Sequence, residues 1–391
     1  MEDISKQAPE DDNIIQYSNK KSSIFIFAAA AVIVIVMIVC ILNVYNKSIT
    51  YSEYDVVQSV IRQDTESAQY VRYANGYIRY SNDGAAYYDL SGNPVWNQTY
   101  EMTDAQIRIC EGYIAIGNLR GSTVYIFNRN GLVNIIDTAL TITGIDVARQ
   151  GVFAVSLEDG EVNYINLYTA QGDKISSIKT TLSGDGYPLA MALSEDGYKL
   201  AVSYVSVNGE QLETNIAFYN FSDVGKNEVG RLVGGFNQYG DSIVAKVEFV
   251  DNNTLIAVGE DVISTYSISQ YPELVAEVAI EEEIQKIFYS SSYIGLIFNN
   301  NDSEEKYRLE VYSLNGNKEY EMTYGEEYRN FEFSDDYILM YNEKEFLYMT
   351  VKGKVKYLGT FDMSIEKLIP LDSKQKFIMV NSKYVQEIRL R

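Results

Sequence analysis

Histidine is absent from the chain of 391 residues, and this absence removes most familiar active-site chemistry. Without an imidazole there is no Ser-His-Asp triad, no Cys-His pair, no histidine zinc site and no histidine pH switch. The two cysteines, Cys40 in an apolar run and Cys110 in a strand-like segment, are not placed to form a disulfide. Carboxylate pairs remain, but their chemistry depends on a separation that only the fold sets. We therefore predict no catalytic residue and no enzyme activity.

The oxygen-rich stretch 299–305 (NNNDSEE) is the strongest candidate for a cation site. Calcium loops place acids or amides at alternating positions and a glycine at the sixth position. Asn299, Asn301 and Ser303 alternate in this way, but Glu304 stands where the glycine belongs. We predict a long, solvated hairpin, with calcium binding as the alternative, and we expect no metal or cofactor elsewhere.

Two other segments have compositions that could bind a ligand. The acidic run Glu281 to Glu283 falls between two repeat units, where we expect a solvated loop, with a binding role as the alternative. The glycine-rich stretch 225–240 (GKNEVGRLVGGFNQYG) lacks both the G-K-[ST] and the G-x-G-x-x-G fingerprints of phosphate and dinucleotide sites. We predict that this stretch is a long connection between strands that decorates one face of the fold.

The longest apolar segment is 24–42 (IFIFAAAAVIVIVMIVCIL), with 19 consecutive apolar residues. As a helix it would span about 28 Å, close to the ~30 Å hydrocarbon core of a bilayer. The alternatives are a cleaved signal peptide, a lipid attached at Cys40 and a buried core helix. The run is longer than a typical signal core, Val39 stands where lipidation needs a small residue, and no polar face interrupts it. We predict a retained transmembrane helix.

The basic residues around this segment predict its orientation. Lys20 and Lys21 abut its N-terminal end, whereas Lys47 stands alone on the other side until Arg62. Cytoplasmic flanks carry the excess of Lys and Arg. We therefore predict a single-pass protein of the cell membrane with a cytoplasmic tail at 1–23, a tether at 43–53 and an extracellular domain at 54–391.

The segment after the predicted helix is strongly acidic. From residue 43 onward it holds 49 Asp and Glu against 29 Lys and Arg, a net charge of −20. This field excludes nucleic acid as a partner and opposes docking on anionic lipid. Solubility explains the charge; attraction of basic partners or of divalent cations is the sharper alternative.

From Tyr70 onward the pattern predicts an all-β fold. Short runs rich in Val, Ile, Tyr and Phe alternate with turn residues, and no helix-length amphipathic segment occurs. Asn-Gly or Asp-Gly, the strongest short hairpin signal, begins at eight positions. These positions are Asn75, Asp83, Asn130, Asp159, Asp185, Asp196, Asn208 and Asn315.

The strand pattern also repeats. A turn recurs with a mean spacing of 43.5 residues at Gly92, Gly131, Gly172, Gly225, Pro272, Gly316 and Gly353. This spacing matches the ~40–50 residues of a four-stranded propeller blade. We predict a β-propeller.

The last repeat unit is incomplete, because only three strand-like runs follow Gly353. A missing strand would leave an exposed sheet edge. Residues 54–62 (YDVVQSVIR) suit either a short helix or a strand, and they are the only spare strand-like piece upstream. We predict that this segment completes the last blade by pairing with it, which gives eight four-stranded blades, with seven as the alternative.

Two local motifs resemble known propellers. The stretch 192–204 (ALSEDGYKLAVSY) resembles the turn between the first two strands of many blades, with Asp196 and Gly197 in the turn and Leu200 in the core together with Ala201. The stretch 88–100 (YDLSGNPVWNQTY) resembles a quinoprotein-type repeat.

In the quinoprotein family the tryptophan of this repeat, here Trp96, docks one blade against the next. Only one unit of this chain has the tryptophan, so the resemblance implies architecture and no bound quinone.

Over most of its length the chain is similar to an uncharacterised family of clostridial-type Gram-positive bacteria, a domain of unknown function. The resemblance is carried by residues 80–102, 158–168, 203–236 and the terminal EIRLR. It implies single-pass membrane proteins with a propeller-like, WD40-like ectodomain, and it transfers no active residues.

We expect a binding or scaffold module of the cell envelope, whose partner is an envelope or membrane protein or a glycan. Propellers offer a rigid face where the loops of all blades converge, and this expectation rests on fold analogy. The alternative is a transmembrane sensor whose ectodomain binds a ligand. A carboxylate-based enzyme is the third possibility.

Overall fold

The computed structural model describes residues 27–38, 48–62, 64 and 67–391. The chain divides into two compact units, Met1–Thr50 and Tyr51–Arg391. In the first unit residues 27–38 form a helix, and all its residues are exposed. The rest of the predicted transmembrane segment, the predicted tail at 1–23 and residues 43–47 of the predicted tether lie outside the described residues. No helix within the described ranges is long and apolar enough to cross a membrane.

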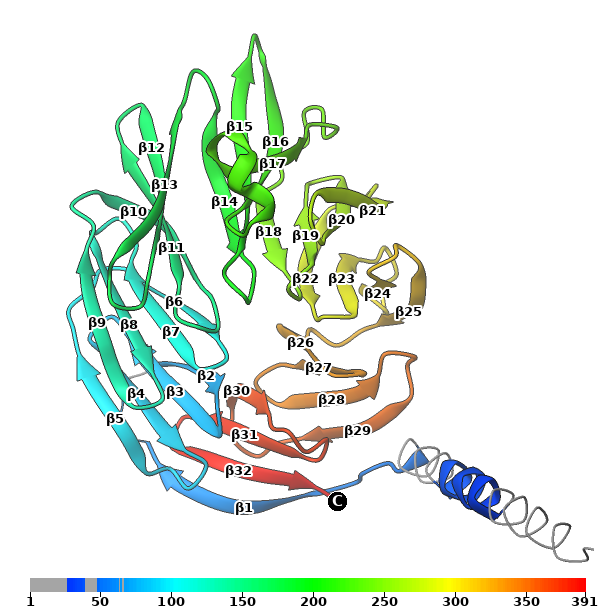
Figure 1. The fold of residues 1–391 in the computed structure, drawn as a ribbon. Helices are drawn as coiled ribbons and strands as arrows, with labels where there is room; N and C mark the ends of the chain where they lie inside the picture. The colour runs from blue at the N-terminus through cyan, green and yellow to red at the C-terminus, as the bar shows by residue number, and fades with distance from the viewer. Residues whose placement is uncertain (1–26, 39–47, 63, 65–66) are drawn as a thin grey trace, which may run out of the picture. The chain divides into compact units, whose positions relative to one another are not determined.

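The second unit is a β-propeller of eight sheets with four antiparallel strands each (Figure 1). Blade one contains β2 (Gln69–Tyr73), β3 (Gly76–Ser81), β4 (Gly84–Asp89) and β5 (Pro94–Thr99). Blade two contains β6 (Ala105–Cys110), β7 (Tyr113–Asn118), β8 (Thr123–Asn128) and β9 (Gly131–Asp137). Blade three contains β10 (Thr141–Val147), β11 (Phe153–Asp159), β12 (Val162–Tyr168) and β13 (Lys174–Thr181). Blade four contains β14 (Tyr187–Leu193), β15 (Lys199–Asn208), β16 (Gln211–Asn220) and β17 (Leu232–Phe236).

The remaining blades follow the same order. Blade five contains β18 (Lys246–Phe249), β19 (Thr254–Val258), β20 (Val262–Ile268) and β21 (Pro272–Ala279). Blade six contains β22 (Ile284–Tyr289), β23 (Tyr293–Asn299), β24 (Tyr307–Ser313) and β25 (Lys318–Tyr324). Blade seven contains β26 (Asn330–Ser334), β27 (Tyr337–Tyr341), β28 (Glu345–Thr350) and β29 (Val355–Thr360). Blade eight contains β30 (Ile365–Pro370), β31 (Lys376–Asn381), β32 (Tyr384–Leu390) and β1 (Tyr54–Ile61). The prediction of eight four-stranded blades is confirmed, and the seven-blade alternative is wrong.

The outermost strand of blade eight comes from the start of the propeller unit. β1 pairs antiparallel with β32, from Tyr54 opposite Leu390 to Ile61 opposite Tyr384, so the helix alternative for residues 54–62 is wrong. On its other side β1 reaches the β4–β5 turn of blade one, where the Gln58 amide donates to the carbonyl of Ser91. A side chain at Gly92 in this turn, where φ is +75°, would collide with Val60 of β1. β1 therefore lies between blade eight and blade one.

The burial of each strand explains its sequence pattern. The second strand of each blade has sheet neighbours on both sides and blades on both faces, so it reads as a continuous apolar run, such as Tyr337–Tyr341 (YILMY). The outer strands alternate between exposed and half-buried positions, as Pro272–Ala279 does.

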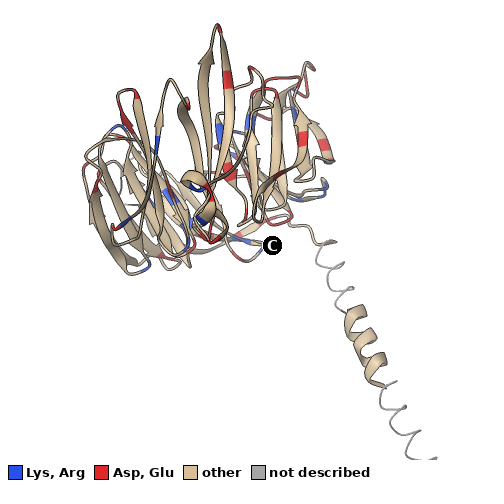
Figure 2. Ribbon diagram, turned by 45° about the horizontal axis from the view of Figure 1, so that its top comes forward, with Lys and Arg blue, Asp and Glu red and all other residues tan. Residues whose placement is uncertain are grey.

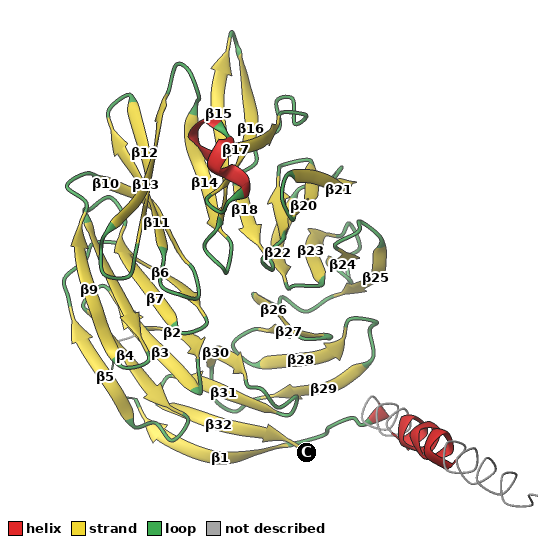
Figure 3. Ribbon diagram, viewed as in Figure 1, coloured by secondary structure: helices red, strands yellow, loops and turns green. Residues whose placement is uncertain are grey.

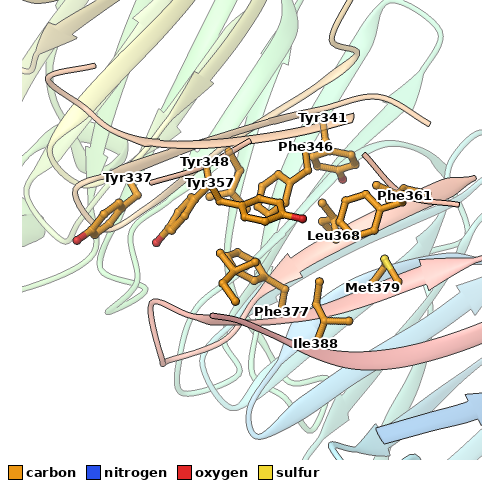
Figure 4. Close-up of a cluster of buried hydrophobic side chains, with 13 residues drawn as sticks. Tyr337, Tyr341, Phe346, Tyr348, Tyr357, Phe361, Leu368, Phe377, Met379 and Ile388 are labelled. Atoms are coloured by element: carbon orange, nitrogen blue, oxygen red, sulfur yellow. The ribbon is translucent and has the colours of Figure 1, made fainter. Parts of the chain in front are cut away.

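The hydrophobic core lies between adjacent blades. Figure 4 shows the cluster shared by blades seven and eight, in which the ring of Phe346 meets the ring of Phe377 edge-on at 5.3 Å. The ring of Tyr348 also packs on the ring of Phe377, with centroids 5.4 Å apart. Edge-to-face pairs at this spacing add to the stabilisation from burial. Each blade is thus stabilised mainly by its neighbours.

The blade-docking role expected for Trp96 is confirmed. Its indole on β5 stacks on Phe127 of β8 in the next blade, with centroids 4.8 Å apart and planes within 5°. The indole also covers Gly131, whose φ of +117° is unfavourable for other residues. The expected turn at Asp196 and Gly197 is also present, and Leu200 beyond it is fully buried.

The glycine-rich stretch 225–240 is not one long connection, and this prediction is wrong in part. It contains most of η1 (Val224–Asn227), then η2 (Val229–Arg231) and the outer strand β17 of blade four. The apolar side chains of β17 decide this outcome, because Val233 is buried and Phe236 packs on Tyr266 of blade five at 4.7 Å. The stretch before β17 belongs to the connection from β16, and the stretch after β17 belongs to the connection to blade five.

The antiparallel order gives the propeller two distinct ends (Figure 3). Successive strands reverse direction, so the turn between the second and third strands and the connection to the next blade lie at one end, which we call the top face. The turns between strands one and two and between strands three and four lie at the other end, the bottom face. The ten-residue strands β15 and β16 extend their hairpin beyond the other top-face turns of Figure 1.

Candidate functional site

The principal cavities of the propeller are lined by top-face segments and by the inner strands below them. One of them has a volume of about 850 Å³ and lies at the top of blade five, against β22 of blade six. It is lined by residues 241–243, 245–246, 258–261 and 280–287. We call it the acidic pocket.

The acidic pocket combines a charged rim with an apolar lining. Its carboxylates are Asp241, Glu260, Asp261, Glu281, Glu282 and Glu283, all on exposed residues. Its apolar lining residues are Ile243, Ala245, Val258, Ile280, Ile284 and Ile287. Glu282 is paired with Arg308 at 2.6 Å, whereas no ion pair is recorded for the other five carboxylates within the described residues. The structure thus places the run Glu281 to Glu283, which composition alone assigned to a solvated loop, on the rim of a cavity.

The acidic character continues along the top loops of blades six and seven, and Figure 2 shows Asp and Glu in red on the ribbon. Further exposed carboxylates in these loops belong to Asp302, Glu304, Glu305, Glu326, Glu327 and Glu343. The exposed cations in the same loops are Lys306, Arg329 and Lys344. We call these carboxylates, together with those on the rim of the acidic pocket, the acidic sector. The negative potential of the acidic sector attracts cationic groups.

A second group of charges lies on the inner strands around the central axis. Arg108 on β6, with Lys246 and Glu248 on β18, lines a cavity of about 310 Å³. The Lys246 ammonium lies 4.5 Å from the ring centre of Tyr289 on β22. Burial lowers the pKa of Lys246, and burial together with Glu248 raises the pKa of Tyr289.

Asp146 on β10 belongs to the same group. Its carboxylate accepts hydrogen bonds from the backbone amides of Leu193, at 2.7 Å, and Val147, at 2.9 Å. Atoms of the inner strands surround the carboxylate, although the residue as a whole keeps partial access to solvent. Burial outweighs the two hydrogen bonds and, with a smaller contribution from Glu248, raises the pKa of Asp146 to about 7.

The Asp146→Asn variant is expected to flatten the pH dependence of stability. Because the folded pKa of Asp146 lies above its unfolded value, the wild type loses stability as pH rises from about 4 to about 7. The neutral amide does not ionise, so the free energy of unfolding of the variant should rise relative to that of the wild type over that pH range. Urea unfolding at pH 4, 6 and 8 measures this difference. Asp302→Asn is the opposite control, since backbone amides hold the pKa of Asp302 below its usual value; an unchanged slope in Asp146→Asn would contradict the assignment.

Cys110 does not provide a nucleophile. Burial, with smaller contributions from Glu195 and Asp146, raises the pKa of its thiol to about 12. The reactive form of cysteine is the thiolate, which this environment disfavours at neutral pH.

The oxygen-rich stretch 299–305 forms the exposed β23–β24 turn. Asp302 accepts hydrogen bonds from the backbone amides of Glu304, at 2.7 Å, and Glu305, at 3.0 Å, and thereby stabilises its own loop. In the part of the chain that the structure describes, no group of three or more His, Cys, Asp or Glu residues is arranged to hold a metal ion.

Sequence reasoning missed the charges on the inner strands. A usable signal was present: Arg108, Asp146 and Glu248 interrupt strands that are otherwise largely apolar. These three side chains come together near the axis only because of how the blades are arranged, and a local sequence pattern does not reveal that arrangement.

These observations define a class of protein, an eight-bladed β-propeller with four-stranded blades and with cavities toward the top face. Residues 46–390 match the family of unknown function DUF5711, and the chain belongs to this family. The predicted membership of a propeller family of unknown function is confirmed; the bacterial group stays a prediction. A comparison with curated proteins finds no match.

Solved structures share the fold at low sequence identity. BamB from Moraxella catarrhalis is 12% identical with a TM-score of 0.55, and the match covers 86% of this chain and 100% of BamB. Sqt1 from Chaetomium thermophilum, solved bound to the N-terminus of ribosomal protein L10, is 11% identical with a TM-score of 0.56, covering 86% of this chain and 99% of Sqt1. At such identities the comparison shows the fold alone.

Proposed function

We propose that this protein is a non-enzymatic scaffold of the cell envelope that binds a basic segment of a partner protein through its acidic sector. The observation that carries the proposal is the acidic pocket, where six carboxylates outnumber two lysines, Lys246 and Lys286, around an isoleucine-rich lining. Only Glu282 among these carboxylates has an ion pair within the described residues. Charge complementarity would steer and orient the partner, and apolar contacts would supply the affinity. BamB and Sqt1 share the fold, and Sqt1 was solved with a bound protein segment, which supports a protein partner.

The second part of the proposal is a single-pass anchor at residues 24–42, with the tail at 1–23 in the cytoplasm and the propeller, 54–391, outside. The apolar length of this segment and the Lys20–Lys21 flank support it. The exposure of every residue in the described helix 27–38 fits a lipid environment. Protease added to intact protoplasts should digest the propeller; full protection would contradict this orientation.

The third part concerns the ring. We propose that β1 latches blade eight to blade one, since it pairs with β32 and contacts the turn at Ser91 and Gly92. Such a latch would keep the edge of β32 from pairing with another chain.

Neutralising the acidic rim should weaken partner capture. The variant Glu260→Gln, Glu281→Gln, Glu283→Gln removes three carboxylates without breaking the Glu282–Arg308 pair. In-cell crosslinking with mass spectrometry should recover one dominant partner with the wild type and about tenfold less with the variant. Capture should also weaken as ionic strength rises.

The matched control is Asp173→Asn, Asp335→Asn, Asp336→Asn, which removes the same charge from exposed bottom-face turns. This control should capture as the wild type does. Equal loss in both triple variants, or recovery of only self-crosslinks and background from the wild type, would contradict the proposed function.

A further inference from the structure

A smaller pocket of about 360 Å³ lies between blades three and four, beneath the extended β15–β16 hairpin. One wall is Thr180 of β13 with Asp185 from the connection that follows. The other is β15 and β16, from which Tyr204, Glu213 and Tyr219 line the space. We call it the crevice pocket. It shares no residue with the acidic pocket.

Thr180 in this wall and its ladder neighbour Asn163 are buried polar side chains that lack partners. Thr180 is 4% exposed, and its hydroxyl oxygen makes no hydrogen bond. Asn163 lies directly opposite Thr180 in the β12–β13 ladder, is 1% exposed, and its amide nitrogen is also unpartnered. Native proteins rarely leave such atoms unsatisfied, because each buried polar group without a partner destabilises the fold.

Both atoms belong to the face that blade three turns toward blade four. Asn163 alternates in phase with Ile165 and Leu167, which pack in one cluster with Leu200 and Val202 of blade four. Ile178 lies opposite Ile165 in the ladder, as Thr180 lies opposite Asn163. These apolar contacts lie next to the unpartnered pair, and Thr180 of that pair lines the pocket.

The remaining lining groups are polar but carry no positive charge. The hydroxyls of Tyr204 and Tyr219 lie 3.2 Å apart and share one hydrogen bond. Asp185 and Glu213 supply carboxylates, and the other polar lining residues are Ser206, Thr214, Asn215 and Asn237. Among the described residues that line the pocket there is no lysine or arginine. An anionic ligand would meet two carboxylates and no counter-charge.

We propose that the crevice pocket binds one neutral saccharide unit. Each sugar hydroxyl can donate to a carboxylate while it accepts from an amide or a hydroxyl, which is the mixture that this lining offers. The unpartnered Thr180 hydroxyl would gain a partner from such a ligand. The volume of about 360 Å³ falls at the small end of the usual range for ligand pockets, ~300–1,000 Å³, as a single ring requires.

The long β15–β16 hairpin explains why this crevice has a polar lining above its apolar contacts. Its strands β15 and β16 have ten residues each, against five to seven in the second and third strands of the other seven blades. The extra length carries Ser206, Glu213 and Thr214 above the crevice. This site does not rest on the proposed protein partner, since different residues and a different ligand class are involved.

The test titrates the purified full-length chain with glucose, galactose, mannose and N-acetylglucosamine by saturation-transfer NMR. At least one neutral sugar should bind saturably, with glucuronate about tenfold weaker or worse because of its charge. Thr180→Val and Glu213→Gln should each weaken binding about tenfold. Glu210→Gln, at the exposed hairpin tip outside the pocket, should bind as the wild type does.

The Thr180→Val variant also separates binding from folding. Valine has nearly the same shape and removes an unpartnered buried hydroxyl, so the variant should be at least as stable as the wild type. If chitotriose or maltotriose binds more tightly than the single sugar, the ligand is the end of a saccharide chain. If they bind equally, the ligand is a free sugar. No saturable binding of the four sugars, equal binding of glucuronate, or full binding by both pocket variants would overturn the proposal.

Discussion

Replacing Arg62 by alanine is expected to lower the free energy of unfolding by about 3–5 kcal/mol, the usual loss when one partner of a buried ion pair is removed. Its side chain is 5% exposed and follows directly after β1. The guanidinium donates to Asp64 at 3.0 Å, to Glu366 of β30 and to the carbonyl of Asn381 at 2.8 Å. Without it, the carboxylate of Asp64, itself 6% exposed, loses its cationic partner and keeps the hydrogen bond from Tyr70. Urea unfolding at pH 7 measures the loss.

The same variant has a pH signature. Burial alone would raise the pKa of Asp64, but the hydrogen bonds from Arg62 and Tyr70 outweigh it and hold that pKa below its usual value. The stability from this pair is therefore present at neutral pH and lost as pH falls through the lowered pKa. The gap between wild type and Arg62→Ala should narrow toward pH 3. In a double-mutant cycle, Asp64→Asn should destabilise the Arg62→Ala background less than the wild type; additive effects would show that the pair is not coupled.

Phe346→Ala should destabilise the propeller by about 3–5 kcal/mol, as large-to-small changes of buried aromatic residues do. Phe346 is fully buried, and its ring meets Tyr357 of the same blade at 5.6 Å and Phe377 of blade eight at 5.3 Å (Figure 4). The cavity would open between two blades whose strands have little freedom to collapse into it. Thermal or denaturant unfolding measures the effect.

Leu358→Ala is the matched control, because Leu358 lies on β29 of the same blade but is 59% exposed. Its effect should stay within about 0.5 kcal/mol. If the two variants lost similar stability, the cluster between blades seven and eight would not be the tightly packed core that the geometry indicates.

Most of the fold could be predicted from the repeat pattern, because the strands and turns of each blade have a recognisable local sequence pattern. Tyr337–Tyr341 (YILMY) is unbroken since a second strand is covered on every side, and Trp96 marked a blade contact by itself. The stretch 225–240 misled, because its glycines resemble a loop although Val233 and Phe236 pack as a strand.

The site was much less predictable. Glu281 to Glu283 could be recognised as a charge run, but not as the rim of a cavity that needs the isoleucines of β22. Thr180 and Asn163 are unremarkable in sequence, since their lack of partners exists only when two blades meet. Residue type reveals which groups are polar, whereas only packing reveals which are left unsatisfied.

The pairing of β1 with β32 also has a consequence for the order of events during synthesis. Tyr54 leaves the ribosome long before its partner Leu390 exists. At ~5–20 residues per second the interval is roughly 20–70 seconds. Throughout it, seven blades can form in turn while the first strand waits with its edges unpaired. The ribosome therefore delivers the outer strand of blade eight first and the other three strands of that blade last.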